Sequence, residues 1–251
     1  MNKMEERAKK AKKQVDYMER NFISSLVDSV KNTKIYDAEI PLDTFISSKD
    51  MKVSVVPMGT SEAIIKNNKP HMAALNFASY TTPGGGFLAG AMAQEEALCH
   101  DSNLYNILSK FPEFYKENAK NLNKGLHTDK ALYTPGVVFE SEGKIATCDI
   151  ITCASPDKTE ALLKGAKISE NSKALSDRIK FVLQIAAMNK VKTLILGAWG
   201  CGVFGQDPRE VATLFKKHLI NFRGFSEVIF AIPKGNGNYE VFKDVFKEEE
   251  V

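Results

Sequence analysis

From residue 53 onward, short and almost continuous apolar runs alternate with amphipathic segments. The runs cover residues 53–56, 72–77, 150–153, 193–196 and 228–232. Strands that are apolar on both faces are typical of a sheet covered by helices on both sides. Between the runs, apolar residues recur at the i, i+3, i+4 spacing of a helix, as in segments 179–186 and 211–219. The alternation predicts an α/β three-layer sandwich (α/β/α) with a mixed, largely parallel central sheet.

The first 50 residues have a different pattern, in which apolar side chains fall close to one face of a helix. These side chains are Val15, Met18, Phe22, Leu26 and Val30. We therefore expect a helical extension over residues 1–50, followed by one domain over residues 51–251. The extension also contains a basic run, Lys9, Lys10, Lys12 and Lys13, for which a solvated first turn or a frayed end is favoured over a docking patch.

Composition excludes several classes of protein. The chain has 251 residues, of which 43% are hydrophobic and 26% charged, as in an ordinary globular protein rather than a disordered, collagen-like or coiled-coil one. Its formal net charge of +3 is too small to indicate nucleic-acid or membrane binding. No apolar run reaches the length of a membrane helix or a secretory signal, so we expect a cytoplasmic protein.

The four cysteines show no metal-binding or disulfide pattern. They are Cys99, Cys148, Cys153 and Cys201, with no C-x-x-C pair and no histidine at zinc-finger spacing. We expect all four to be reduced, and no metal site. The histidines, His71, His100, His127 and His218, form no H-x-x-x-H pair, and a structural role is favoured for each.

The first of two glycine-rich loops follows the run at 72–77. Three successive glycines, Gly84, Gly85 and Gly86, precede Gln94, Glu95 and Glu96, which open a helix expected over residues 93–111. Acidic residues in a first helical turn can simply complement the helix dipole. Alternatively, the apolar neighbours raise the pKa of one carboxylate toward that of a general acid. Adjacent helical residues point about 100° apart, so we expect the two glutamates to have different roles.

The second loop follows the run at 193–196. It contains Gly197, Gly200, Gly202 and Gly205, and it ends at Asp207 and Pro208, which are typical of a helix start. Backbone N–H groups in such a loop form a concave anion site, so a nucleotide diphosphate is favoured over a purely structural turn. Within the loop, Trp199 is expected in the core, whereas Phe204 fits a core position or a sugar contact equally well.

Together the two loops resemble a known family. The triple glycine, seven intervening residues and Gln94-Glu95-Glu96 resemble the GGG-x(6–8)-QEE signature of poly(ADP-ribose) glycohydrolases of the bacterial type, which have a macrodomain-like core. Residues 197–204 are similar to the diphosphate-binding loop of that branch. The resemblance covers about residues 53 to 235.

The resemblance implies a role for each matched position. Glu96 would be the catalytic residue, first acid and then base, in cleavage of the ribose–ribose O-glycosidic bond. Glu95 and Asn76 would orient the neighbouring ribose hydroxyls, supported by Gln94. The glycines at 84–86 would let the loop approach the substrate. The positions implied to bind the diphosphate and the distal ribose are Gly200, Cys201, Gly202, Val203 and Phe204.

The implied partners are ADP-ribose or poly(ADP-ribose), and ADP-ribosylated proteins as further candidates, with nucleic acid only as a modified target. The implied enzyme is a monomer that needs no cofactor. Two alternatives stay open: a hydrolase of single ADP-ribose units on protein or nucleic acid, and a macrodomain that binds ADP-ribose without turnover. The carboxylate of Glu96 favours an enzyme, whereas no residue is predicted to contact the adenine. Cys201 fits a small residue at a tight turn better than a nucleophile.

Overall fold

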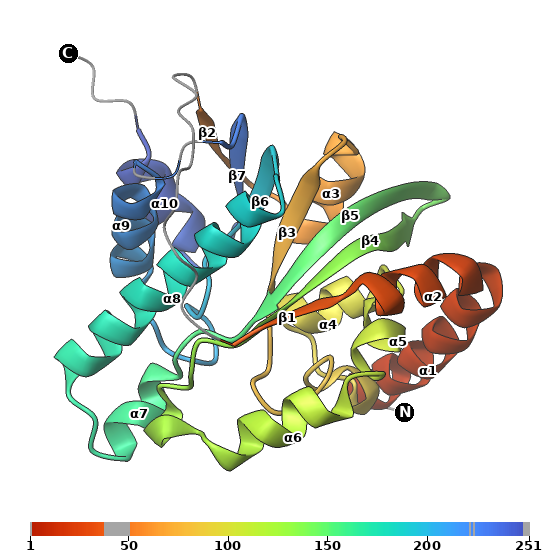
Figure 1. Cartoon of the computed structure of the whole chain (residues 1–251), viewed down its shortest axis with the longest axis horizontal. Coiled ribbons are helices and arrows are strands. Elements are labelled where there is room, and N and C mark those ends of the chain that lie inside the picture. Colours follow the sequence, from red (N-terminus) through yellow and green to blue (C-terminus); the bar gives the residue numbers. More distant parts are fainter. Residues whose placement is uncertain (1, 38–50, 221, 223, 248–251) are drawn as a thin grey trace.

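The computed structural model describes residues 2–37, 51–220, 222 and 224–247 as one mixed sheet with helices on both faces (Figure 1). The strands are β1 (Lys34–Tyr36), β2 (Lys52–Val56), β3 (Met72–Phe77), β4 (Ala131–Ser141), β5 (Lys144–Cys153), β6 (Thr193–Leu196) and β7 (Glu227–Ala231). Their order across the sheet is β1-β4-β5-β3-β6-β7-β2. Strands β5, β3, β6, β7 and β2 run parallel to one another, and β1–β4 and β4–β5 are antiparallel pairs. The mixed, largely parallel sheet is thus confirmed.

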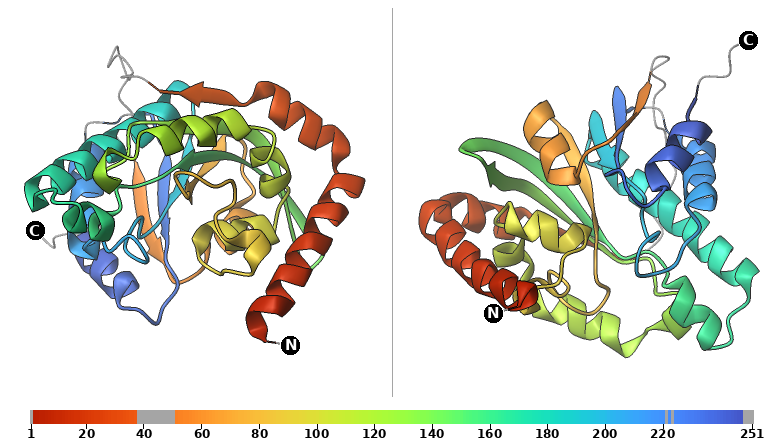
Figure 2. Two further views of the ribbon diagram at one scale, coloured as in Figure 1. Left: turned by 90° about the horizontal axis from the view of Figure 1, so that it is seen from below. Right: turned by 180° about the vertical axis from the view of Figure 1, so that it is seen from behind.

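Two helical layers cover the sheet, as the two views of Figure 2 show. The first layer contains α1 (Lys3–Asn21), α2 (Ile23–Asn32), α3 (Thr60–Asn67), α4 (Gln94–His100), α5 (Leu104–Leu108) and α6 (Pro112–Lys120). The second contains α8 (Ile168–Met188), α9 (Pro208–Leu219) and α10 (Asn238–Val245). Shorter elements are α7 (Lys158–Leu163) and the 3-10 turns η1 (Phe87–Ala89) and η2 (Asn123–Gly125).

The side chains of the central strand β3 show why the sequence needs both layers. Ala73 and Leu75 are fully buried in the core under α8 and α9, and Met72 and Ala74 are buried in the core under α1 to α6. Successive residues of a strand point to opposite faces of the sheet. A six-residue strand with five apolar side chains can therefore be buried only between two helical layers. The predicted three-layer architecture is confirmed.

The sequence pattern did not reveal β4, the longest strand. Pro135 and Gly136 lie in its middle and are ordinary turn signals. In the structure, Gly136 has a φ of +67° and its N–H donates to Asp149 Oδ1, while the register shifts between Thr134 and Val137. The strand therefore continues through a β-bulge, which accommodates both residues.

The prediction of one helix over residues 93–111 is wrong. Helix α4 ends at His100, and α5 begins only at Leu104. Between them, Asn103 pairs with Val138 of β4 through both its backbone N–H (3.1 Å) and its side-chain Oδ1 (3.0 Å). This pairing with a distant strand interrupts the helix. The spacing of apolar residues continues through the break, so the sequence pattern did not predict it.

The N-terminal segment is helical, as predicted, but in two pieces that meet at Phe22. Met18 and Leu26 are buried beneath them. Strand β1 then pairs with the edge of the sheet at β4. The expected boundary at residue 50 falls within 38–50, outside the described residues, so the division of the chain there stays a prediction. None of the described helices has the length and apolar character needed to cross a bilayer.

Candidate active site

A cavity of about 800 Å³ lies where loops leave the carboxyl ends of the parallel strands, and its size is that of a small-molecule site. The first glycine-rich loop and α4 contribute Gly85, Gly86, Gln94, Glu95 and Glu96 to its lining, and the second loop contributes Trp199, Gly200, Gly202, Val203 and Phe204. The fold thus brings the two loops together from positions more than 100 residues apart in sequence. Asn76, Gly84 and Cys201, also singled out from the sequence, are not among the lining residues.

Gln94 links the start of α4 to the end of β3 by hydrogen bonds. Its Oε1 accepts a hydrogen bond from the N–H of Phe77 (2.8 Å), and its Nε2 donates to the carbonyl of Leu75 (2.9 Å) and to Thr60 Oγ1 (3.1 Å). The amide therefore joins the end of β3 and the start of α3 to the start of α4. The two glutamates that follow are fixed relative to the sheet as a result.

Glu95 is the more deeply buried of the two glutamates. Its carboxylate accepts hydrogen bonds from Asn76 Nδ2 (3.0 Å) and from the backbone N–H of Ser79 (2.7 Å). Burial raises the pKa of Glu95 from its ordinary value of 4.5 to about 8, against the hydrogen bonds from Ser79 and Asn76, which lower it. At neutral pH this side chain is therefore largely a neutral acid.

Asn76 lies behind Glu95 rather than at the cavity surface. It is fully buried, and its Nδ2 also lies 3.4 Å from Thr152 Oγ1. Within the described ranges, its Oδ1 is a buried oxygen without a hydrogen-bond donor. The contact of Asn76 with Glu95 fixes the orientation of that carboxyl group.

Glu96 faces the cavity in a different direction and has only 7% of its surface exposed. Its Oε1 accepts a hydrogen bond from the N–H of Gly86 (2.8 Å), and its Oε2 accepts one from the N–H of Ala93 (2.9 Å). The second bond satisfies an N–H at the helix start, as acidic residues at this position often do. The first bond joins the carboxylate to the triple-glycine loop. Glu96 therefore fits the helix-capping interpretation, whereas the carboxyl group whose pKa is raised by burial is that of Glu95.

The middle glycine of the triplet lies against both carboxylates. A Cβ at Gly85 would be 2.6 Å from Glu96 Oε1 and 3.0 Å from Glu95 Oε2, and the residue has a φ of +57°. Glycine is required here for both its backbone conformation and the close approach. At Gly86 a Cβ would instead meet Ala91 at 2.6 Å, and at Gly84 it would meet the Tyr105 ring at 2.7 Å.

The second loop presents unpaired backbone donors to the cavity. Among described residues, the N–H groups of Gly200, Gly202, Val203 and Phe204 have no hydrogen-bond partner, and all four residues line the cavity. Successive free N–H groups in a glycine-rich turn form an anion site. The helix that follows does not add to it, because the Asp207 carboxylate already caps α9 through the N–H of Glu210 (2.8 Å).

The two aromatic side chains of this loop have different positions. Trp199 is 1% exposed and belongs to the core, as predicted. Phe204 is half-buried and lines the cavity, and its ring contacts the His127 ring edge-on, with 5.9 Å between the centroids. Cys201 is partly buried beneath the loop, and burial raises the pKa of its thiol to about 12, so it has no character of a nucleophile.

Sequence reasoning missed the connection between Phe204 and the first loop. His127 stacks on Tyr80 (4.2 Å between centroids), and its Nδ1 lies 2.8 Å from the carbonyl oxygen of Ser155. Burial lowers the pKa of His127 to about 4, so the neutral ring donates from Nδ1. No local pattern marks this residue, because its partners come from three other segments of the chain.

The described cysteines are all unpaired. Within the described ranges, no group of three or more His, Cys, Asp and Glu side chains is arranged to bind a metal ion.

The fold and the cavity define an α/β protein with a nucleotide-sized site that combines free loop amides with two buried carboxyl groups. The chain belongs to the family described as microbial-type PARG, catalytic domain, which matches residues 4–140. The matched region includes the first glycine-rich loop and α4, whereas the second loop lies beyond it. The solved members below are poly(ADP-ribose) glycohydrolases, so the family is one of hydrolytic enzymes.

Solved structures of bacterial members are similar over almost the whole chain. Poly(ADP-ribose) glycohydrolase from Thermomonospora curvata is 28% identical, with a TM-score of 0.87, and covers 96% of this chain and 100% of its own. Its structure with the inhibitor ADP-HPD has 27% identity, a TM-score of 0.83 and the same coverage. The enzyme from Deinococcus radiodurans in complex with ADP-ribose is 30% identical, with a TM-score of 0.78, over 88% of this chain and 97% of its own. A search of curated proteins found no significant match.

Proposed function

We propose that this protein hydrolyses the ribose–ribose O-glycosidic bonds of poly(ADP-ribose) and releases ADP-ribose. The observation that supports this most directly is the pairing, in one cavity, of the sheltered carboxyl group of Glu96 with the free amides of Gly200, Gly202, Val203 and Phe204. The first group can transfer a proton at a glycosidic oxygen, and the second can bind a pyrophosphate. The membership in the PARG family supplies the identity of the substrate.

The binding step uses the second loop. The pyrophosphate of ADP-ribose accepts hydrogen bonds from the N–H groups of Gly200, Gly202, Val203 and Phe204, and the Phe204 ring packs against the distal ribose. The thiol of Cys201 points away from this surface, so its contribution is the backbone of the turn. His127 fixes the Phe204 ring from behind, because it stacks on Tyr80 at the same time.

The bond-breaking step uses Glu96. Its carboxylic acid donates a proton to the glycosidic oxygen while the bond from that oxygen to the anomeric carbon breaks, and an oxocarbenium-like ribose forms. The resulting Glu96 carboxylate then accepts a proton from a water molecule, whose oxygen bonds to the anomeric carbon. One residue serves as acid and then base, and its protonated state is restored. The reaction uses only protein groups and water.

Glu95 orients the ribose rather than exchanging a proton with the leaving oxygen. Its carboxyl group is fixed by Asn76 and Ser79, and with a pKa of about 8 it is neutral in most molecules at pH 7. A neutral acid can donate to one ribose hydroxyl and accept from another. Gln94 fixes the helix on which both glutamates lie.

Activity on two substrates tests this proposal. Wild-type protein and Glu96→Gln are incubated with poly(ADP-ribose) and, separately, with a mono-ADP-ribosylated peptide, and ADP-ribose binding is measured by calorimetry. We expect wild type to degrade the polymer, and Glu96→Gln to lose about 10² to 10⁴-fold in turnover while it still binds ADP-ribose. Cleavage of the peptide alone would identify a mono-ADP-ribosyl hydrolase, and binding without any turnover would identify a reader; either result contradicts the proposal.

The wider setting is also part of the proposal. We propose a cytoplasmic monomer in which residues 51–251 form the macrodomain-like catalytic domain and residues 1–50 a helical extension. Four unpaired cysteines support a reducing compartment. The partners are the polymer, ADP-ribose and ADP-ribosylated proteins.

A further inference from the structure

The basic N-terminal half of α1 lies directly beside the catalytic loop. A Cβ on Gly90, four residues after the triple glycine, would be 2.1 Å from the carbonyl oxygen of Met4 and 3.0 Å from the backbone nitrogen of Ala8. The Arg7 guanidinium also donates to the carbonyl of Gly90 (3.3 Å). The left view of Figure 2 shows this end of α1 alongside the loop that leads into α4. The first turns of α1 therefore pack against the loop that joins the triple glycine to α4, next to the cavity lining at Met92 but not within it.

This part of α1 has an excess of positive charge. Residues 3–13 contain six basic side chains, Lys3, Arg7, Lys9, Lys10, Lys12 and Lys13, against two acidic ones, Glu5 and Glu6. The five lysines are exposed, and none of the six forms an ion pair with another described residue. Charges that are not paired within the protein remain available to a ligand.

Three of the cations share one face of α1. Lys3, Arg7 and Lys10 are spaced four and three residues apart, which places them in one row along the helix. Arg7 reaches Gly90, and Arg7 and Lys10 are both close enough to His100, at the end of α4, to lower its pKa, although burial of the ring is the larger cause. Arg7 and Lys10 therefore lie on the side of α1 near α4, whereas the helical period places Lys9 and Lys12 on the other side of the helix.

Two exposed apolar side chains lie in the segment between the triple glycine and α4. Met92, which lines the cavity beside Glu96, is 56% exposed, and Leu88 in η1 is 39% exposed on the part of the loop that α1 covers. An apolar strip beside a row of cations suits a ligand that alternates planar bases with phosphates. A short peptide or a free sugar would use only part of such a surface.

We propose that Lys3, Arg7 and Lys10, with Leu88 and Met92, bind the leaving strand of poly(ADP-ribose), that is, the polymer on the far side of the bond that Glu96 cleaves. This inference rests on the proposed function. Met92 lines the same cavity as Glu96 and is largely exposed, so in this proposal the unit beyond the cleaved bond leaves the cavity past Met92. Its pyrophosphate then meets the row of cations on α1. The surface gives the enzyme a preference for polymer over a single unit.

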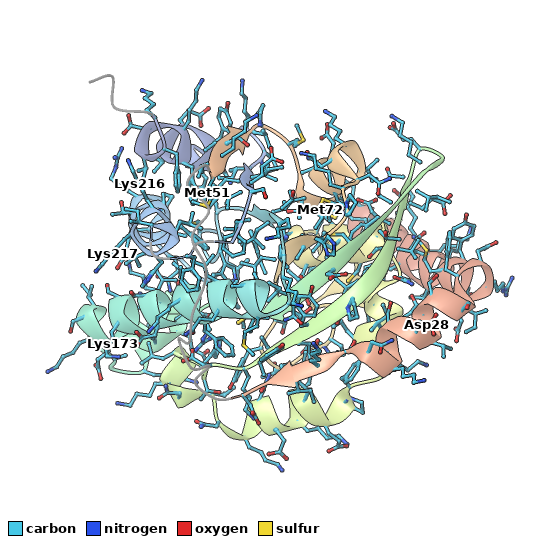
Figure 3. All side chains as sticks on the ribbon, turned by 45° about the horizontal axis from the view of Figure 1, so that its top comes forward. Asp28, Met51, Met72, Lys173, Lys216 and Lys217 are labelled. Carbon is cyan, nitrogen blue, oxygen red and sulfur yellow. The ribbon has the colours of Figure 1, made fainter. Side chains whose placement is uncertain are left out.

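The test compares neutralised pairs of lysines on different surfaces. Lys3→Gln/Lys10→Gln removes two charges from the row, and Arg7 is left in place because it packs on Gly90. Lys9→Gln/Lys12→Gln removes the same charge from the other side of the same helix. Lys216→Gln/Lys217→Gln removes it from α9, which lies across the molecule from α2 and its Asp28 (Figure 3). Thermal unfolding verifies that all three variants are folded.

Initial rates on poly(ADP-ribose) and on a mono-ADP-ribosylated peptide are then measured over a range of salt concentrations. For Lys3→Gln/Lys10→Gln we expect kcat/KM on the polymer to fall about tenfold at about 50 mM salt, and its logarithmic salt dependence to lose about 1.4 units of slope, or about 0.7 for each lost phosphate contact. Calorimetric affinity for ADP-ribose, activity on the peptide, and both control pairs stay within about twofold of wild type.

Several results would overturn the inference without affecting the proposed function. Unchanged polymer kinetics in Lys3→Gln/Lys10→Gln would remove the surface from the reaction. An equal loss in either control pair would show an effect of net charge only, and an equal loss on the peptide would show that no polymer strand is involved. The proposed function fails separately, if wild type does not cleave the polymer or Glu96→Gln retains its activity.

Discussion

Gly85→Ala is the substitution most sensitive to the geometry of the acidic pair. The new Cβ would lie 2.6 Å from Glu96 Oε1, and ordinary contact begins at 3.4 Å. The oxygen must therefore retreat by about 0.8 Å, away from the Gly86 N–H that now fixes it, and a displacement of about 1 Å at a reacting group can cost on the order of 10² in rate. The backbone cost of a non-glycine residue at φ +57° is about 1 to 2 kcal/mol of stability.

A matched control separates the collision from the backbone cost. Gly165 has a φ of +80° and nothing within 4 Å of its ideal Cβ, so Gly165→Ala has a comparable backbone cost without a collision. We expect similar losses of unfolding free energy in both variants, measured by urea denaturation, but loss of kcat on poly(ADP-ribose) only in Gly85→Ala. If Gly85→Ala retains kcat within about twofold of Gly165→Ala, the position of the Glu96 carboxylate is not what limits catalysis.

Three further predictions follow from the site. Because the pKa of Glu95 is about 8 in the folded chain and 4.5 as its ordinary value, the folded state binds more protons between these values, and wild type loses stability as the pH rises through them. Glu95→Gln cannot titrate, so its thermal stability should vary less with pH between these values than that of wild type; parallel pH profiles would contradict the assignment. Gln94→Glu places a carboxylate against the Leu75 carbonyl and removes two donated hydrogen bonds, so urea denaturation should show a loss of about 1 to 3 kcal/mol, which an unchanged midpoint would disprove. Gly202→Val should lower calorimetric ADP-ribose affinity by at least about tenfold with little change in stability, since nothing lies within 4 Å of its ideal Cβ; equal affinity would exclude this loop from the site.

The sequence predicted those strands and helices whose positions follow from the burial of apolar side chains alone. The strands around Leu75 and Ile195 are apolar on both faces, and a sheet with two helical layers is the arrangement that buries them. Strand β4 was not predictable, because Pro135 and Gly136 are accommodated only by a bulge that pairs with Asp149. The break between α4 and α5 depends in the same way on the pairing of Asn103 with a distant strand.

In the candidate site, too, some features were predictable from the sequence and others were not. The spacing of the first loop and of Gln94-Glu95-Glu96 indicated two glutamates with different roles, and the structure gives them different partners. Which glutamate is buried more deeply could not be predicted, since it depends on Asn76 and on the N–H of Ser79. The contribution of His127 was also hidden, because it depends on a stack with Tyr80 and an edge contact with Phe204, and not on a sequence pattern.

The central claim is that a bound ADP-ribose places its anomeric carbon at Glu96. A crystal structure of this protein with ADP-ribose measures that distance directly. The account predicts the anomeric carbon within about 3.5 Å of a Glu96 carboxylate oxygen, with the pyrophosphate on the N–H groups of Gly200, Gly202, Val203 and Phe204. A terminal ribose bound elsewhere, with Glu96 still engaged only by Gly86 and Ala93, would contradict it.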